Sequence, residues 1–348
     1  MSVLAPDLLD PRGTSWPEAA TRCCRHGEPR DLVPRPSRII ESEGPEGLTR
    51  KFLLPVAGTT QSGGELETES VIIPMRTRGR VRLTHTLCVS SQVGCAMGCD
   101  FCETAQMGLI RSLEPWEIVQ QWWAATYHLG AEIKNIVFMG MGEPLDNAAN
   151  VVRAIEVLTH HLGPSVAMKN ITISTVGRLD GLAMLRDRVR RHGWKKLNLA
   201  VSINAPNDAI RSRIMPINRA MPLGELVGML EDWPLVAGKG IMAEYVLIPG
   251  VNDADEHADE LASLLRGVRA CVNVIPYNPR RDSPWPAPDE GEVDRFLHRL
   301  EANGQFCKRR RTKGRDTMAA CGQLGNERIR RRRFVELGTP TDLQDAMR

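Results

Sequence analysis

Three closely spaced cysteines carry the clearest chemical signal in this sequence. Cys95, Cys99 and Cys102 form a CxxxCxxC run, and Phe101 stands directly before the last of them. Three thiolates are one fewer than a cubane iron–sulfur cluster binds. Because the fourth iron would then be open to a small molecule, the run predicts one [4Fe–4S] cluster that takes part in chemistry, with Phe101 shielding it from water.

Structural zinc is the alternative for such a group of thiols. Zinc sites of this kind close around four ligands, usually as two CxxC pairs or as paired cysteines and histidines. The sequence has no second CxxC pair and no histidine pair at finger spacing. The triplet therefore favours the open iron–sulfur cluster.

Length and composition predict a cytoplasmic enzyme. The chain has 348 residues, of which 42% are hydrophobic and 25% charged, as is ordinary for a soluble globular protein. No apolar run approaches the length of a membrane span, and the first residues lack the pattern of a secretory signal. Nine cysteines in such a chain point to reduced, working thiols and not to a disulfide scaffold.

Apolar strand-like runs alternate with helical segments through most of the chain, which is typical of parallel β/α units. The expected strands are 84–89, 135–139, 170–174, 197–202, 241–248 and 271–275, preceded by a short strand at 67–74 and a basic turn at 75–82. The expected helical segments are 114–127, 148–161, 179–192, 208–236, 254–266 and 289–303. Six such units predict an α/β fold built as a partial (β/α)6 barrel.

The two ends of the chain differ from this core. Residues 1–65 are rich in Pro, Gly and Arg and are expected to form a short, irregular accessory region, followed by a catalytic core at 66–335 and a tail at 336–348. Two basic clusters, at 308–315 and 328–333, form a C-terminal basic extension. Their charge density suits the phosphates of a nucleic acid, although a charge run is more often a solvated surface.

Polar residues follow directly on several predicted strands. In parallel β/α folds, ligands bind at the carboxyl ends of the strands. The cysteine loop, residues 142–143, Ser174, residues 202–204 and Asn278 each stand at such a position. We therefore expect them to converge on one rim.

With these residues in view, the sequence resembles the radical S-adenosylmethionine (SAM) enzymes and, among them, the RlmN/Cfr family of ribosomal RNA adenine methyltransferases. The resemblance covers about residues 67–329. It is carried by the segments TLCVSSQVGC at 86–95, MGMGEP at 139–144, SINAPND at 202–208, IPYNP at 275–279 and ACGQL at 320–324.

The resemblance implies a role for each matching residue. The three cysteines of the triplet would bind the cluster. Cys321 is similar to the family's methyl-carrying cysteine, Cys88 to the cysteine that forms a transient disulfide with it, and Glu69 to the proton acceptor. The implied contacts to S-adenosylmethionine are Gly142, Glu143, Ser174, Ser202, Ile203, Asn204 and Asn278.

Ordinary polar methylation fails at a ring carbon of adenine, because this carbon has no lone pair with which to attack a sulfonium methyl group. In the family, the cysteine matching Cys321 first takes a methyl group from one S-adenosylmethionine. A second S-adenosylmethionine supplies the deoxyadenosyl radical that activates this methyl for addition to the base. A base then removes the ring proton, and the cysteine matching Cys88 releases the product as a disulfide forms. The resemblance implies methylation of carbon 2 or carbon 8 of an adenine in large-subunit rRNA, or also in tRNA.

The resemblance also indicates the reductant and the oligomeric state, and the sequence departs from the family pattern at several positions. It implies flavodoxin or ferredoxin as electron donor and a monomeric enzyme. Asn204 stands where the family generally has His, Glu103 and Met107 alter the segment after the cluster, and the N-terminal region is shortened. The exact RNA and the choice between carbon 2 and carbon 8 therefore stay open.

Two other classes of function remain open from the residues. One is a radical SAM enzyme that acts on a peptide or a small metabolite, which would have no use for Cys321. The other is a non-catalytic iron–sulfur or zinc protein that binds RNA. Taken alone, Cys88 is more often a buried strand cysteine, Glu69 a surface carboxylate and Asn278 a turn residue.

Overall fold

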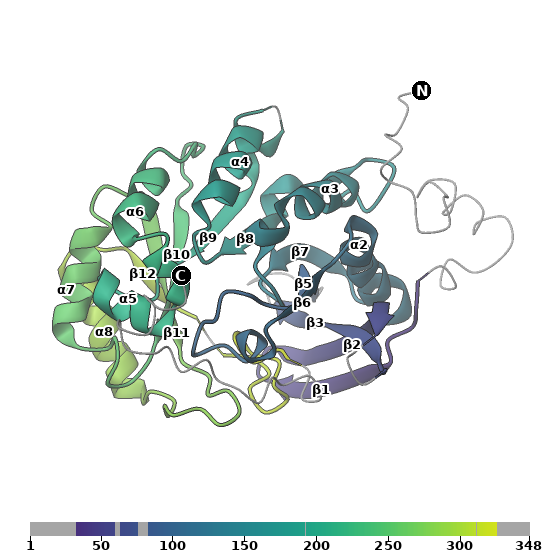
Figure 1. Ribbon diagram of the computed structural model, residues 1–348, viewed down its shortest axis with the longest axis horizontal. Coiled ribbons are helices and arrows are strands. Elements are labelled where there is room, and N and C mark those ends of the chain that lie inside the picture. Colours follow the sequence, from purple (N-terminus) through teal and green to yellow (C-terminus); the bar gives the residue numbers. More distant parts are fainter. Residues whose placement is uncertain (1–32, 60–62, 76–82, 192, 311, 326–348) are drawn as a thin grey trace, which may run out of the picture.

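The computed structural model describes residues 33–59, 63–75, 83–191, 193–310 and 312–325. Within them, ten strands form one sheet with helices over its outer face, and two more strands form a small second sheet (Figure 1). The basic cluster at 328–333, the end of the predicted core at 335, the tail at 336–348 and all but the first residue of the turn expected at 75–82 lie outside the described residues.

Seven parallel strands form the part of the sheet that corresponds to the predicted barrel. In order across the sheet they are β4 (Thr84–Cys88), β7 (Ile133–Phe138), β8 (Ile171–Thr175), β9 (Asn198–Ser202), β10 (Ile241–Leu247), β11 (Ala270–Pro276) and β12 (Cys307–Arg309). The first six coincide with the predicted strands, so the (β/α)6 architecture is confirmed. The seventh, β12, lies in a segment that the sequence marked as basic.

Helices connect these strands in the predicted order. They are α2 (Pro115–Trp123), α3 (Ala148–Thr159), α4 (Leu179–Arg190), α5 (Asp208–Ile214), α6 (Leu223–Glu231), α7 (Asp255–Leu264) and α8 (Glu290–Ala302). Apart from the short α5, each buries an apolar face in the main core, as Ile155 and Leu158 of α3 do. Burial of such a side chain contributes about 1.5–3 kcal/mol. None of the described helices has the length and apolar character needed to cross a bilayer.

The irregular structure expected for residues 1–65 is wrong over residues 38–59. There β1 (Arg38–Gly44) and β2 (Gly47–Thr59) form an antiparallel hairpin, and β3 (Glu65–Met75) pairs with both β2 and β4. Of the Pro and Gly residues in this region, Gly44, Pro45 and Gly47 form the tight turn of the hairpin, whereas Pro55 and Gly58 lie within β2. Alternate side chains of β2, such as Phe52 and Leu54, are buried in the main core, so the sheet is continuous across residue 65.

The segment after β12 connects the two ends of this sheet. β1 and β12 are the outermost strands, and residues 312–325, here called the strap, run between them (Figure 1). The Lys313 ammonium group lies 2.7 Å from the Glu46 carboxylate beside β1, and Ser42 donates to Asp316 at 3.1 Å. At least part of the predicted basic extension is therefore engaged within the protein.

A buried carboxylate fixes the start of α2 against the hairpin. Glu117 accepts the backbone N–H groups of Ala57 at 3.0 Å and Glu114 at 2.9 Å. The Arg111 guanidinium pairs with the same carboxylate at 2.5 Å. Because breaking a buried pair leaves its partner uncompensated, this carboxylate should contribute strongly to stability.

We expect Glu117→Gln to lower the free energy of unfolding by about 2 kcal/mol, since Arg111 loses its counter-charge. Glu114→Gln, on the exposed side of the same turn, should change it by less than about 0.5 kcal/mol. Urea titration under oxygen-free conditions measures both. Equal changes in the free energy of unfolding for the two variants would show that the Arg111–Glu117 pair adds nothing to stability.

Candidate functional site

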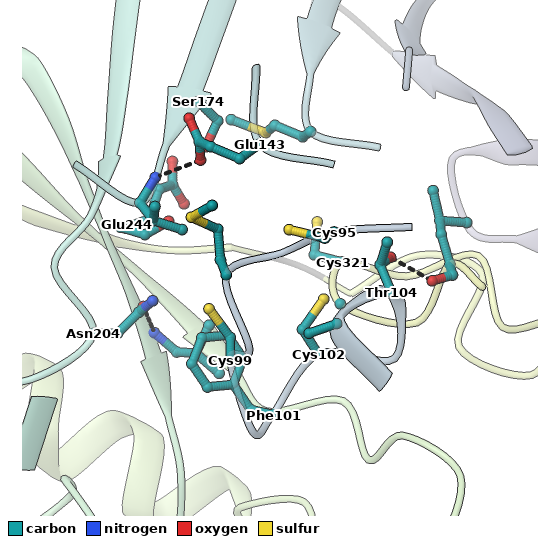
Figure 2. A pocket seen from close by; sticks show the side chains of 18 of the residues that line it. Cys95, Cys99, Phe101, Cys102, Thr104, Glu143, Ser174, Asn204, Glu244 and Cys321 are labelled. Carbon is teal, nitrogen blue, oxygen red and sulfur yellow. Dashed lines mark hydrogen bonds between the residues drawn. The ribbon is translucent and has the colours of Figure 1, made fainter. Parts of the chain in front are cut away.

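The three cysteines of the triplet lie on one loop between β5 (Gln92–Gly94) and β6 (Leu109–Ser112). At Gly94, φ is +77°, and a Cβ atom would come within 1.9 Å of the Gly108 carbonyl oxygen, so the start of the loop requires glycine. All three thiols border a cavity of about 160 Å³ at the carboxyl ends of the strands. Figure 2 shows their sulfur atoms around the same space.

The surroundings of these thiols fit a metal cluster. Burial raises the pKa of Cys95, Cys99 and Cys102, and at Cys99 the neighbouring thiols raise it further. Bound metal cations offset the cost of burying a thiolate, because coordination favours the deprotonated form. Apolar side chains, including Met215 and Tyr277, pack around the loop. No three Cys, His, Asp or Glu side chains among the described residues could share one metal ion, whereas a cubane binds each cysteine through a different iron.

A tight turn after β7 places Glu143 against the same cavity. At Gly142, φ is +94°, and a Cβ atom would lie 2.5 Å from that of Gln92, whose side chain accepts the Glu143 N–H at 2.9 Å. The Glu143 carboxylate accepts the N–H groups of Leu145 and Val176, both at 2.9 Å. Burial raises the pKa of Glu143 to about 7. A cationic ligand group would find a dry, fixed acceptor here.

The ends of β8, β9 and β11 supply the remaining predicted cofactor contacts. Ser174, Ser202, Asn204 and Asn278 line the cavity, whereas the side chain of Ile203 is packed in the main core. Asn204 has φ +56°, a left-handed conformation that Asn tolerates better than most residues. Ile203 is not among the residues that line the cavity, and its backbone N–H and carbonyl bond to Glu244 and Arg211, so its role as a cofactor contact stays a prediction.

Arg211 of α5 holds these strand ends and was missed by sequence reasoning. It is 1% exposed, and its guanidinium donates to the carbonyls of Val176, Ser202 and Ile203 and to the side chain of Asn218, at 2.6–3.0 Å. Burial lowers its pKa to about 10. An arginine in a short helix reads as a surface residue, so the sequence offers no sign of this role.

Cys88 and Cys321 lie near each other beside the half-buried guanidinium of Arg310. Cys88 ends β4, whereas Cys321 is a half-buried residue of the strap that lines the cavity; both are free thiols. Burial, with the nearby Cys321 sulfur adding to it, raises the pKa of Cys88 to about 12 despite Arg310. Cys321 in turn is the main cause of a raised pKa at Arg310, followed by Glu244. Sequence analysis placed Arg310 in a basic cluster and did not foresee this inward position.

Two side chains hold the strap over the cavity. The Asn278 side chain donates to the Cys321 carbonyl at 3.4 Å and accepts from the Arg315 guanidinium at 3.1 Å. The Thr104 hydroxyl, next to the cysteine loop, donates to the Leu324 carbonyl at 2.5 Å. The side chain of Asn278, predicted as a cofactor contact, thus makes its hydrogen bonds in this structure with the strap.

Glu69 lies on β3 beneath the end of the strap. It is 4% exposed, lies 3.5 Å from the Lys51 ammonium group and accepts the Gly325 N–H at 3.2 Å. Burial raises its pKa, and Lys51 opposes that shift. Lys51 also donates to the Met318 carbonyl at 3.2 Å. Glu69 borders the strap and is not among the side chains that line the cysteine cavity, so its role as proton acceptor stays a prediction.

Comparison with known proteins identifies the class. Residues 89–262 match the family model of the radical SAM superfamily. The crystal structure of a radical SAM methyltransferase from Sphaerobacter thermophilus is similar, with a TM-score of 0.73 and 37% identity over 87% of this chain and 84% of that chain. Fold and cysteine site together define a radical SAM enzyme, which uses a [4Fe–4S] cluster and S-adenosylmethionine.

Two relatives narrow this to one family. The "Probable dual-specificity RNA methyltransferase RlmN 1" of Protochlamydia amoebophila is 42% identical over 288 residues, which are 83% of this chain and 76% of the relative. The "Dual-specificity RNA methyltransferase RlmN" of Syntrophotalea carbinolica is 44% identical over 276 residues, or 79% and 69% of the two chains. The chain belongs to the RlmN family, as its sequence motifs predicted.

The raised pKa of Glu143 makes a prediction about pH. In the folded, cofactor-free protein this carboxyl keeps its proton up to about pH 7, whereas in the unfolded chain it loses the proton near its ordinary pKa of 4.5. Its contribution to the free energy of unfolding is therefore present below pH 4.5 and is lost as the pH rises to about 7. The loss should be about 3 kcal/mol. Glu143→Gln should remove this part of the slope, and the same slope in both proteins would contradict the assignment; urea titrations across the range measure it.

Proposed function

We propose that this protein is an RNA methyltransferase that methylates a ring carbon of adenine, carbon 2 or carbon 8, through a methylated Cys321. One arrangement carries the proposal: a strap cysteine borders the same cavity as the three cluster cysteines, with Cys88 and Arg310 beside it. An enzyme that does not transfer a one-carbon unit has no use for a thiol in this place. The names of the relatives as dual-specificity RNA methyltransferases support RNA as the substrate class, and within it we propose large-subunit rRNA and also tRNA.

Different residues would bind the cluster, bind S-adenosylmethionine and accept the methyl group. When bound, the cluster and two molecules of S-adenosylmethionine per turnover supply the methyl group and the radical that activates it. Cys95, Cys99 and Cys102 hold the cluster, and Glu143 receives the cationic amine of the cofactor. Cys321 would lose its thiol proton, and its sulfur would displace the methyl group from the sulfonium of a bound S-adenosylmethionine, so that the old carbon–sulfur bond breaks as the new one forms. The Arg310 guanidinium favours this step, because a nearby positive charge stabilises a thiolate.

Cys88 and Glu69 complete the proposed reaction. Glu69 accepts the proton of the modified ring carbon, for which a carboxylate in a dry site with a raised pKa is suited. Cys88 then attacks the sulfur of Cys321, so that a disulfide bond forms and the bond from that sulfur to the carbon on the base breaks; that carbon keeps the bonding electron pair and takes up a proton to become the methyl group. Its raised pKa requires that its proton leave first, and the nearby Arg310 guanidinium favours that loss.

The remaining expectations complete the proposal. We propose that the enzyme is monomeric, acts in the cytoplasm and takes electrons from flavodoxin or ferredoxin. Residues 1–65 would act as an accessory region to a catalytic core that begins at residue 66 and extends to residue 335.

Mass spectrometry tests the proposal at two points. Protein purified without oxygen should carry one methyl group on Cys321, and large-subunit rRNA from cells that lack the gene should lose one methyladenine. An unmodified Cys321 together with unchanged nucleosides would refute the proposal. A peptide or small-molecule substrate would then become the better reading of the site.

Cys88→Ala should trap the reaction before release. We expect a covalent adduct between Cys321 and RNA to accumulate, and free methyladenine to fall on the order of a hundredfold, because no second thiol can displace the product. Cys307→Ala is the matched control, since that buried thiol packs against α8. If Cys88→Ala releases methylated RNA at the normal rate in single-turnover assays, the proposed role of Cys88 is wrong.

A further inference from the structure

A second cavity lies inside the sheet, behind Cys321. It has a volume of about 540 Å³ and shares Met139, Glu244, Ile275, Asn278, Arg310 and Cys321 with the cysteine cavity. We call it the inner chamber. Ligand sites for organic molecules commonly have volumes of roughly 300–1,000 Å³, so the chamber has room for a nucleotide. Cys321 stands on the wall between the two cavities.

The lining of the inner chamber is unusual for a β/α barrel. Each of the six strands from β4 to β11 contributes one polar side chain, namely Thr86, Asn135, Thr172, Asn198, Glu244 and Asn273. Barrel interiors are ordinarily filled by layers of branched apolar side chains. A hollow interior lined with amides and hydroxyl groups therefore indicates a polar ligand.

The charges around the chamber favour an anionic ligand. Lys169, Arg309, Arg310 and Lys313 line it, against the carboxylates of Glu46 and Glu244. Cationic side chains around a groove of this kind bind phosphate groups. A nucleotide, with one phosphate and one heterocyclic base, matches both the charge and the polar lining.

Glu244 has an unmet hydrogen-bonding group on the wall that the two cavities share. It is 4% exposed. One carboxyl oxygen accepts from the Asn273 side chain at 2.8 Å and lies 3.8 Å from the Arg310 guanidinium. The other oxygen is buried without a hydrogen-bond partner among the described residues. Buried polar atoms in proteins nearly always have partners, so this oxygen awaits a donor from a ligand.

Adenine offers the complementary edge. Its amino group donates, and the ring nitrogen beside it accepts. Burial raises the pKa of Glu244, although Arg310 and Asn273 oppose the shift, and this direction favours the protonated form. A protonated carboxyl group presents one acceptor and one donor side by side, which matches adenine. Guanine presents the reverse pattern.

We propose that the inner chamber binds the target adenine nucleotide of the RNA substrate and that the carboxyl group of Glu244 recognises the amino edge of the base. The inference rests on the proposed function for its substrate class. It places the base on one side of Cys321 and the cofactor on the other. Glu244 then selects adenine over other purines, a role separate from methyl transfer.

A titration with two nucleotides tests this recognition. The holoenzyme, saturated with S-adenosylhomocysteine to fill the cofactor site, is titrated with adenosine 5′-monophosphate and with purine riboside 5′-monophosphate, which lacks only the amino group. Ligand-detected NMR gives both dissociation constants. We expect the wild type to bind the adenine nucleotide about tenfold more tightly. No binding, or no preference, would overturn the proposal.

Variants assign the preference to Glu244. Glu244→Leu should abolish it, and Glu244→Ala carries the same expectation if the leucine variant does not fold. Glu244→Gln, which keeps an acceptor and a donor, should retain it. Glu256→Gln, at an exposed carboxylate of α7 that lines neither cavity, is the matched control and should retain it too. If Glu244 had only a structural role, its loss would weaken the binding of both nucleotides equally. An unchanged preference in Glu244→Leu would refute the assignment.

The outcome is independent of the test for the proposed function. Cys321 methylation and rRNA nucleosides are measured without reference to Glu244. If these fail while the adenine preference is found, the chamber binds adenine nucleotides for another reaction. If they succeed while the preference is absent, the RNA base is recognised elsewhere.

Discussion

The attachment of the strap to the N-terminal hairpin is the constraint on which the site depends. The sheet is open, and the strand that precedes the strap lies at the opposite end from β1. The Lys313–Glu46 ion pair and the hydrogen bond from Lys51 to Met318 draw the strap across that opening. Because Cys321 follows Met318 by three residues, these contacts also bring the Cys321 thiol to Cys88.

The site concentrates charge in places that water does not reach. Arg211, Glu69, Glu143 and Glu244 are all buried. Such groups persist only where partners offset the loss of hydration. Backbone carbonyls do so for Arg211 and backbone N–H groups for Glu143. The pKa shifts that remain are the mark of a site built for ligands and not for stability alone.

The sequence predicted what depends on local pattern and spacing. The six β/α units, the cysteine loop and the Gly142–Glu143 turn could all be located, because periodicity and strand ends are written along the chain. Partners across the fold could not, which is why Arg211 and the β1–β2 hairpin were missed. Glu244 did leave a signal: it interrupts the apolar strand β10 on the inward-facing alternation with Met242 and Val246.

The position of Cys321 between two cavities has a kinetic consequence. Under the proposed assignment, the methyl donor and the nucleic acid never need to share one volume, since the sulfur atom faces both. The carrier can be charged while the RNA is absent and discharged after the spent cofactor has left. A cysteine that borders both cavities allows a double-displacement mechanism. The protein then holds the transferred group covalently after the methyl donor has reacted and before the RNA binds.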